Sequence, residues 1–219
     1  MEIKIRSVDG VKEYSRKTDG AGVFVDEDKE RKCNFKVAEF ACKDGSDYIK
    51  IDSALVIMLQ DIRDYFKKPV VINSAYRNAP YNKKIGGASR SQHISGKAAD
   101  ICINGVAPID IARFVESNCK LIKGIGLYTW GVHVDTRSTP AKWDYTTGKE
   151  IAVATFLEGV TNNSPEAPKT NGDYYVVKSG DTVWRICEKN KISLKDFRGL
   201  NPSIKNIALI YPGQKVRIK

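Results

Sequence analysis

The sequence predicts an α+β domain followed by a smaller unit whose elements run strand, helix, helix, strand. Apolar residues between 52 and 66 recur at helical spacing, which predicts an amphipathic helix. Apolar segments at 69–76, 98–103 and 132–136 predict strands, which do not alternate regularly with helices. A polar stretch with two prolines at 161–173 predicts an extended linker between the two units.

Capping residues support the helices of the large unit, which we expect to cover residues 1–160. Asp52 or Ser53 can cap the first helix, because short polar side chains accept from the free N–H groups of the first turn. Pro108 suits the first turn of a second helix that continues to Ser117. A loop rich in glycine and serine separates the first two strands.

The second unit covers residues 174–219. A strand is expected at 174–178 and another at 214–218, with two helices between them. Asp181 can cap the first of these helices and Ser193 the second.

Composition restricts the class of protein. An apolar share of 42% and a charged share of 28% are typical of a soluble globular chain. No run reaches the roughly 18 to 20 apolar residues that span a bilayer, so we expect no membrane insertion. The first residues lack a continuous apolar stretch, so we expect no secretory signal peptide. Five scattered cysteines argue against a disulfide framework and predict free thiols.

The positive charge is concentrated in the second unit. The chain carries a net charge of +10, and residues 174–219 hold ten basic and three acidic residues, a net +7. Such a unit is attracted to polyanions, which include nucleic acids, anionic lipids and acidic wall polymers. No helix-turn-helix or aromatic RNA-binding motif is present, so we do not expect a nucleic-acid partner.

One segment combines candidate metal ligands. A peptidase zinc site needs three ligands from His, Asp, Glu or Cys and leaves a fourth position open. His93 precedes Asp100 by seven positions, and Gly96 between them permits the chain to bend back. His93 and Asp100 could therefore converge on one ion, although a packed or surface histidine is the other interpretation.

The second histidine lies on a predicted strand. His133, Asp135 and Arg137 share one face by the period of two, so a nitrogen ligand, an acid and a guanidinium would point into one cleft. These three side chains extend the candidate site from the loop of His93 to the strand.

The segment Ser91-Gln-His93-Ile-Ser-Gly96-Lys-Ala98-Ala-Asp100, followed by His133-Val-Asp135, resembles the signature of a zinc peptidase family. These are the zinc D-alanyl-D-alanine carboxypeptidases and L-alanyl-D-glutamate endopeptidases, a VanY-like and endolysin-like group. The resemblance implies a DD-peptidase/hedgehog-like zinc domain with a core at about 34–146, and Zn²⁺ held by His93, Asp100 and His133. Further segments fit one branch of the family: Asn34-Phe35-Lys-Val-Ala-Glu39-Phe40, Ser74-Ala-Tyr76-Arg77, Tyr81-Asn82 with Gly86-Gly87, and Gly124-Ile-Gly126-x-Tyr128.

The catalytic acid of the family is replaced. Many members carry a general base three residues before the last histidine, where this chain has Trp130. Asp135 is the candidate substitute that would activate the zinc-bound water, and the alternative is that Asp135 only orients a zinc ligand.

Two arginines and a serine complete the expected site. Arg77 matches the family arginine that would hold a substrate carboxylate or stabilise an oxyanion, and the alternative is a surface arginine at a strand end. Arg137 is a second candidate for that role. Ser91 either binds the substrate or shapes the loop.

Residues 174–219 resemble a LysM module, which implies a βααβ fold that binds glycans containing N-acetylglucosamine, such as peptidoglycan. Trp184 and Ile186 are expected in its core. The expected glycan contacts are Gly180, Asp181, Thr182, Ile210, Tyr211 and Pro212.

Both resemblances point to the bacterial cell wall. They imply a monomeric, endolysin-like zinc peptidase that cuts stem or crosslink amide bonds and acts at the wall after release from the cell. The alternatives are a D-alanyl-D-alanine carboxypeptidase and a catalytically inactive wall-binding protein.

Overall fold

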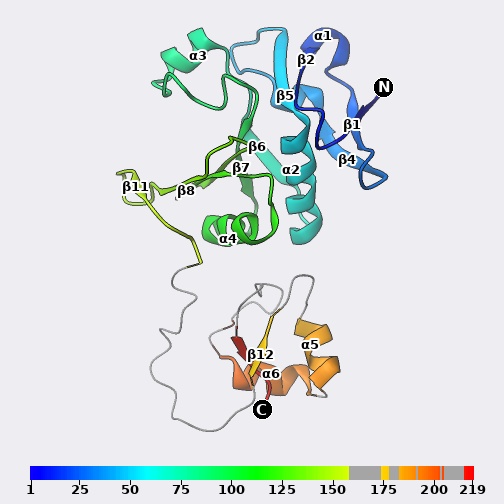
Figure 1. Ribbon diagram of the computed structural model, residues 1–219, viewed down its shortest axis with the longest axis vertical. Coiled ribbons are helices and arrows are strands. Elements are labelled where there is room, and N and C mark those ends of the chain that lie inside the picture. Colours follow the sequence, from blue (N-terminus) through cyan, green and yellow to red (C-terminus); the bar gives the residue numbers. More distant parts are fainter. Residues whose placement is uncertain (158–173, 178–182, 191, 203, 205–214) are drawn as a thin grey trace. The chain divides into compact units, whose positions relative to one another are not determined.

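A computed structural model describes residues 1–157, 174–177, 183–190, 192–202, 204 and 215–219. The chain divides into two compact units, Met1–Ala154 and Thr155–Lys219, which are described separately (Figure 1). Among the described residues, none of the helices has both the length and the apolar composition needed to cross a bilayer. The mixture of helices and strands in the first unit confirms the predicted α+β class.

A six-stranded sheet forms the centre of the first unit. Its strand order is β11-β10-β8-β9-β7-β6, in which β10 and β8 are parallel and the other neighbours antiparallel. The strands are β6 Val70–Ser74, β7 Ala98–Ile103, β8 Gly124–Tyr128, β9 Gly131–Asp135, β10 Ala141–Asp144 and β11 Ile151–Ala152. The prediction of β7 is confirmed residue for residue, whereas β6 ends two residues earlier than expected because Ala75 begins the loop toward α3.

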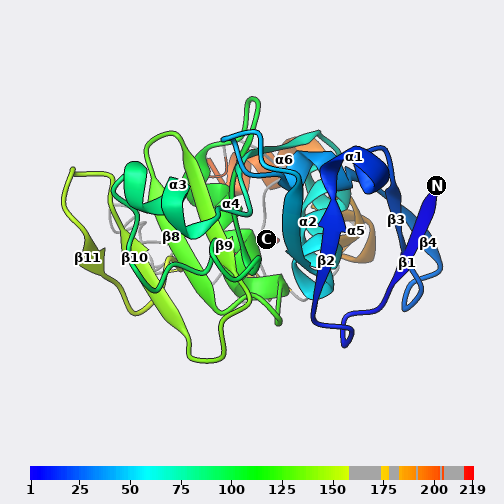
Figure 2. The same ribbon diagram turned by 90° about the horizontal axis from the view of Figure 1, so that it is seen from above.

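Helix α2, Ser53–Phe66, lies between the central sheet and the N-terminal strands, as Figure 2 shows. The carboxylate of Asp52 accepts from the N–H of Ala54, which confirms the predicted cap. Lys67 ends the helix in the left-handed conformation, at a φ of 53°. Leu55, Leu59 and other apolar residues of α2 are fully buried, so this helix forms much of the core.

The N-terminal residues form two small sheets that the sequence analysis did not anticipate. One sheet has the order β1-β3-β4, and the other pairs β2 with β5. The elements are β1 Glu2–Ile5, β2 Val11–Ser15, α1 Arg16–Asp19, β3 Val23–Asp26, β4 Arg31–Lys36, the 3₁₀ helix η1 Val37–Phe40 and β5 Tyr48–Asp52.

Two further helices belong to the first unit. Helix α4, Pro108–Asn118, packs against β8 and β9 and confirms the prediction at 108–117 with one more residue. Helix α3, Ala79–Lys84, is a short helix within the expected glycine- and serine-rich loop, and Asn78 caps it. Figure 1 shows α3 above the strands of the central sheet and α4 below them.

The second unit has the expected strand–helix–helix–strand order. Its elements are β12 Tyr174–Val176, α5 Val183–Asn190, α6 Leu194–Leu200 and β13 Lys215–Arg217, and the two strands pair antiparallel. Ser193 caps α6 as predicted. The buried core consists of Val177, Val183, Ile186, Cys187, Phe197, Val216 and Ile218, which confirms the core position of Ile186. The side chain of Trp184, the linker at 161–173 and all six expected glycan contacts lie outside the described residues.

All five cysteines are free thiols, as predicted from their spacing. Burial raises the pKa of Cys33 to about 11 and the pKa of Cys119 to about 12. Such thiols stay protonated and unreactive near neutral pH.

Candidate metal centre

One face of the central sheet carries a row of aligned residues that crosses five strands. Backbone pairing sets Ser74 opposite Asp100, Asp100 opposite His133, and His133 opposite Gly126. Trp143 of β10 is paired with Gly126 and completes the row. Because side chains alternate between the faces of a sheet, members of one such row point to the same side.

Two glycines of β8 make room on this face. A Cβ atom on Gly124 would lie 2.1 Å from Oδ2 of Asp135, and one on Gly126 would lie 2.4 Å from Cε2 of Trp143. The carboxylate of Asp135 and the indole of Trp143 therefore lie directly over the backbone of β8. This close approach explains why glycines are needed at both positions.

His93 reaches the sheet from a loop rather than from a strand. Its carbonyl accepts from the N–H of Arg77, and its own N–H donates to Oγ of Ser91 at 3.4 Å. Gly96 turns the chain back toward β7 with a φ of +72°, and a Cβ there would lie 2.6 Å from backbone atoms of Lys50. The bend expected at Gly96 is thus present, and Ser91 is in a position to shape the loop.

Three ligand atoms converge between the loop and the sheet. Nε2 of His93 lies 3.2 Å from Oδ1 of Asp100 and 3.2 Å from Nδ1 of His133. Nδ1 of His133 lies 2.9 Å from the same Oδ1. All three residues are buried, and they form a group that could hold a metal ion.

The other nitrogen of each ring fixes its tautomer. Nδ1 of His93 lies 2.7 Å from the carbonyl oxygen of Ala75, which can only accept, so this nitrogen carries the proton. Nε2 of His133 donates in the same way to Oδ2 of Asp135 at 2.9 Å. In neutral rings the nitrogens that face Asp100 therefore carry lone pairs. Two lone pairs and a carboxylate oxygen that face one another form a donor set suited to a cation.

The spacing of the three atoms suits a tetrahedral metal. Ligands about 2.0–2.1 Å from zinc at tetrahedral angles are about 3.3–3.4 Å apart. The observed edges of 2.9–3.2 Å come within a few tenths of an ångström of that triangle. One carboxylate and two imidazoles are also an ordinary donor set for zinc. The residues therefore fit a zinc ion.

The pKa shifts of His93 and Asp100 favour the protonation states in which these side chains bind a metal. Burial lowers the pKa of His93 and so favours its neutral ring. Burial would raise the pKa of Asp100, but hydrogen bonds from His133 and His93 outweigh it and hold that pKa well below its usual range. For His133 burial acts to lower the pKa, but hydrogen bonds to Asp100 and Asp135 outweigh it and raise that pKa.

A second layer of charged groups holds the ligands. The guanidinium of Arg77 bonds to Oδ2 of Asp100 through Nη2, and its Nε donates to Oγ of Ser74 at 2.7 Å. Asp135 accepts from His133 on one side and from Arg137 on the other, with Nη2 of Arg137 at 2.6 Å and its Nε at 2.8 Å. Each ligand on the sheet is thus fixed by its own ion pair.

Comparison with known families agrees with this geometry. Residues 33–135 match the family described as Peptidase M15, and residues 175–219 match the family described as LysM domain. The chain carries a peptidase M15 domain and a LysM domain. The Peptidase M15 match begins in β4 and ends at Asp135, so it includes all three candidate metal ligands.

Three relatives share short stretches with the chain. It is 42% identical over 69 residues to "Endolysin" of Bacillus phage B103, which is 29% of this chain and 26% of that protein. It is 48% identical over 48 residues, 22% of this chain, to "Chlorophenol reductase" of Desulfitobacterium hafniense. It is 34% identical over 44 residues, 20% of this chain, to "SpoIVD-associated factor A" of Bacillus subtilis (strain 168). The chain covers 15% and 11% of the last two proteins, so it spans about a quarter or less of each relative.

Asp135 does not lie where a general base for a metal-bound water would lie. Its carboxylate is 0% exposed and bonds to Nε2 of His133, whereas the metal-facing atom of that ring is Nδ1. Asp135 therefore lies behind the ligand. This geometry favours the orienting role over the role of general base that we expected.

The two arginines are also turned inward. Strand β9 ends at Asp135, so Arg137 lies beyond it and does not continue its face, contrary to the prediction. Its guanidinium instead folds back onto Asp135 and over the ring of Trp143 at 5.4 Å. Arg77 is close to the ligands, as expected, but its Nη2 is engaged by Asp100. The structure thus gives both arginines a carboxylate partner within the protein.

Trp143 is a part of the site that the sequence analysis missed. Its ring lies 5.1 Å from that of His133, and its Nε1 donates to the hydroxyl of Tyr128 at 3.1 Å. The only local signal was an aromatic residue in a short strand, and its alignment with His133 depends on pairing across three strands.

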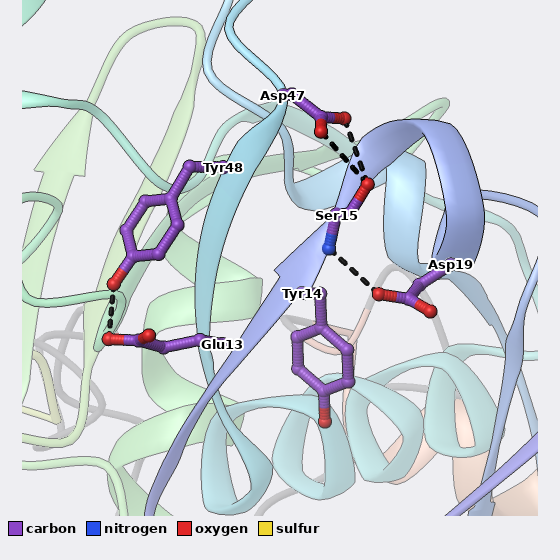
Figure 3. A pocket seen from close by; sticks show the side chains of 6 residues that line it. All are labelled: Glu13, Tyr14, Ser15, Asp19, Asp47 and Tyr48. Carbon is purple, nitrogen blue, oxygen red and sulfur yellow. Dashed lines mark hydrogen bonds between the residues drawn. The ribbon is translucent and has the colours of Figure 1, made fainter.

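A separate hollow lies in the N-terminal part of the first unit and is lined by Glu13, Tyr14, Ser15, Asp19, Asp47 and Tyr48 (Figure 3). Its carboxylates serve local structure. Asp19 accepts from the N–H of Ser15 at 2.7 Å, Asp47 accepts from the hydroxyl of Ser15, and Glu13 accepts from the hydroxyl of Tyr48. The bond to Asp47 joins the start of α1 to the residue before β5, and the bond between Tyr48 and Glu13 joins β5 to β2.

Proposed function

We propose that this chain is a zinc-dependent peptidase that hydrolyses stem or crosslink amide bonds of bacterial peptidoglycan and is held on the glycan by its LysM domain. The observation that carries the proposal is the convergence of His93, Asp100 and His133 within the M15 domain. The similarity to a phage endolysin supports the wall as substrate.

The protein's residues would prepare the site for chemistry in three ways. His93, Asp100 and His133 hold the ion, which supplies Lewis acidity for activating water and polarising the scissile carbonyl. Ser74 and Arg77 hold Asp100 with one oxygen toward the ion. Asp135 and Arg137 hold the tautomer of His133 that directs Nδ1 to the ion.

Arg77 would also stabilise negative charge on the substrate. Its side chain is 14% exposed and pairs with the carboxylate that faces the ion, so an oxyanion formed near the ion would lie close to the guanidinium.

The LysM domain would supply residence on the wall. Its net charge of +7 adds attraction to anionic wall polymers, so binding to whole walls should weaken as salt concentration rises. We place the linker at 161–173 between the peptidase domain of 1–160 and this domain of 174–219.

Two alternatives remain. Trp130 at the position of the family acid favours an inactive protein that only binds the wall. A carboxypeptidase that removes a terminal D-alanine would use the same metal ligands.

The deciding experiment is digestion of purified peptidoglycan by the full chain with added zinc, with and without a chelator. Mass spectrometry of the released fragments identifies the new termini and thereby the bond. Zinc-dependent release, absent in His93→Ala, would support the proposal, and release of free D-alanine alone would identify a carboxypeptidase. Walls that bind the protein but stay intact would leave the inactive binding protein as the conclusion.

A further inference from the structure

A continuous series of aromatic rings leads from the metal centre to the surface. The ring of Trp143 packs against His133, and its Nε1 donates to the hydroxyl of Tyr128. The ring of Tyr128 stacks on that of Trp130 at 5.2 Å with 24° between the planes. The ring of Tyr145 lies 5.7 Å from that of Tyr128, with 35° between the planes. The rings of Trp130 and Tyr145 thus both contact Tyr128, which is hydrogen-bonded to Trp143 beside the metal ligand His133.

The outer rings of this series are open to solvent. Trp130 is 49% exposed and Tyr145, which follows β10 directly, is 42% exposed. Trp130 occupies the two-residue turn between β8 and β9, where a polar residue would serve the backbone equally well. Exposed aromatic rings that cluster beside a reactive site are typical of a binding surface.

We propose that Trp130 and Tyr145, supported by Tyr128, form a subsite that stacks against a sugar ring of the glycan to which the stem peptide is attached. This inference rests on the proposed function. A pyranose presents a face of C–H groups with partial positive charge, and the face of an indole is negative. Stacking of such flat faces needs an exposed ring that is supported from behind, and Trp130, stacked on Tyr128, provides one.

The distance from the metal centre suits a sugar rather than a distant wall component. Trp130 precedes His133 by three residues, and a strand rises about 3.4 Å per residue, so the Cα atoms of these two residues are at most about 10 Å apart. An extended peptide covers about that distance in three residues. In peptidoglycan, the ring that is covalently joined to the stem is the sugar at its start.

This placement has a consequence for the bond that is cut. A sugar stacked on Trp130 brings the first few amide bonds of the stem to His93, Asp100 and His133. The far end of the stem, where a carboxypeptidase acts, would lie beyond the site. The subsite therefore favours endopeptidase action near the glycan.

The test is an NMR titration of the full chain with two probes, in which the indole N–H resonances of its tryptophans are monitored. The chain is kept zinc-free so that no turnover occurs. Trp130→Phe assigns the resonance of Trp130. The two probes are an N-acetylmuramoyl tripeptide and the same tripeptide without the sugar. We expect the Trp130 resonance to shift with the sugar-bearing probe alone. An equal shift with both probes, or a shift with neither, would overturn the inference.

Kinetics on the zinc-loaded chain provide a second measurement. Trp130→Ala should raise KM for the sugar-linked substrate about tenfold, the loss expected for one stacked ring, and leave KM for the free peptide unchanged. Trp130→Phe should recover most of the affinity. The matched control is Leu121→Ala, which removes a residue that is 41% exposed near the opposite end of β8.

The two proposals fail in different ways. If no substrate is cut, the proposed peptidase activity fails while the resonance titration still reports on the subsite. If both substrates are cut with equal KM by wild type and Trp130→Ala, the activity stands and the sugar subsite is wrong.

Discussion

Replacing Asp135 by asparagine separates its two possible roles. Oδ2 of Asp135 accepts from Nε2 of His133 at 2.9 Å and from Nη2 of Arg137 at 2.6 Å. Oδ1 accepts from Nε and the backbone N–H of Arg137 at 2.8 and 3.0 Å. An amide has a single acceptor oxygen, so it cannot satisfy both sides.

Either orientation of the amide weakens the metal site. If its oxygen faces His133, its NH₂ group opposes two N–H donors of Arg137. If its NH₂ group faces His133, the imidazole must move its proton to Nδ1, the atom that faces the ion. Loss of such an orienting partner typically lowers metal affinity 10- to 100-fold, which is about 1.4–2.7 kcal/mol.

The assay is a competition titration of zinc against a chromophoric chelator, combined with turnover at saturating zinc. We expect Asp135→Asn to bind zinc 10- to 100-fold more weakly and to recover much of its turnover once loaded. Asp144→Asn is the control, since it removes the same charge from β10, which is separated from β9 by β8. Zinc affinity within twofold of wild type would refute the orienting role. If turnover then also fell about 10²- to 10⁴-fold, Asp135 would be the general base.

Three other substitutions test the supports of the site. Gly96→Ala places a Cβ 2.6 Å from the backbone of Lys50 at a φ of +72°, so urea unfolding should show a loss of about 2–4 kcal/mol in the free energy of unfolding. The control is Gly45→Ala, at a φ of +84° in open space, which should lose about 1–2 kcal/mol. Gly126→Ala places a Cβ 2.4 Å from the ring of Trp143 and should change the near-UV circular dichroism and lower zinc affinity; an unchanged spectrum would contradict the packing described. Arg77→Lys should weaken zinc binding about tenfold, because an ammonium cannot bridge the carboxylate of Asp100 and the hydroxyl of Ser74 as the guanidinium does. Zinc affinity equal to that of wild type in a calorimetric titration would contradict this expectation.

Local patterns in the sequence were sufficient for the elements that carry the site. The spacing of apolar residues and the cap at Asp52 predict α2, and a run of apolar residues predicts β7. The bend expected at Gly96 permitted His93 and Asp100 to converge, and the resemblance to the zinc peptidase family implied that both are metal ligands.

Helix α3 and the features that depend on pairing between distant segments could not be predicted. Helix α3 has six residues and no apolar period, so only its cap at Asn78 signals it. The partners of Asp135 and Arg77 depend on the direction of each side chain across strands that are far apart in the chain. Trp143 reaches His133 through the pairing of β10 with β8, which leaves no mark in either strand alone.

Metal uptake by this chain measures whether the strands of the central sheet are correctly paired. The site depends on one aligned row of residues, which is Ser74, Asp100, His133, Gly126 and Trp143. A slip of one residue between β7 and β9 would turn His133 to the opposite face and remove a ligand. A chain that is unfolded or wrongly paired therefore has no chelating site. During refolding, zinc binding would report the moment at which these strands have reached their native register, independently of how much secondary structure has formed before.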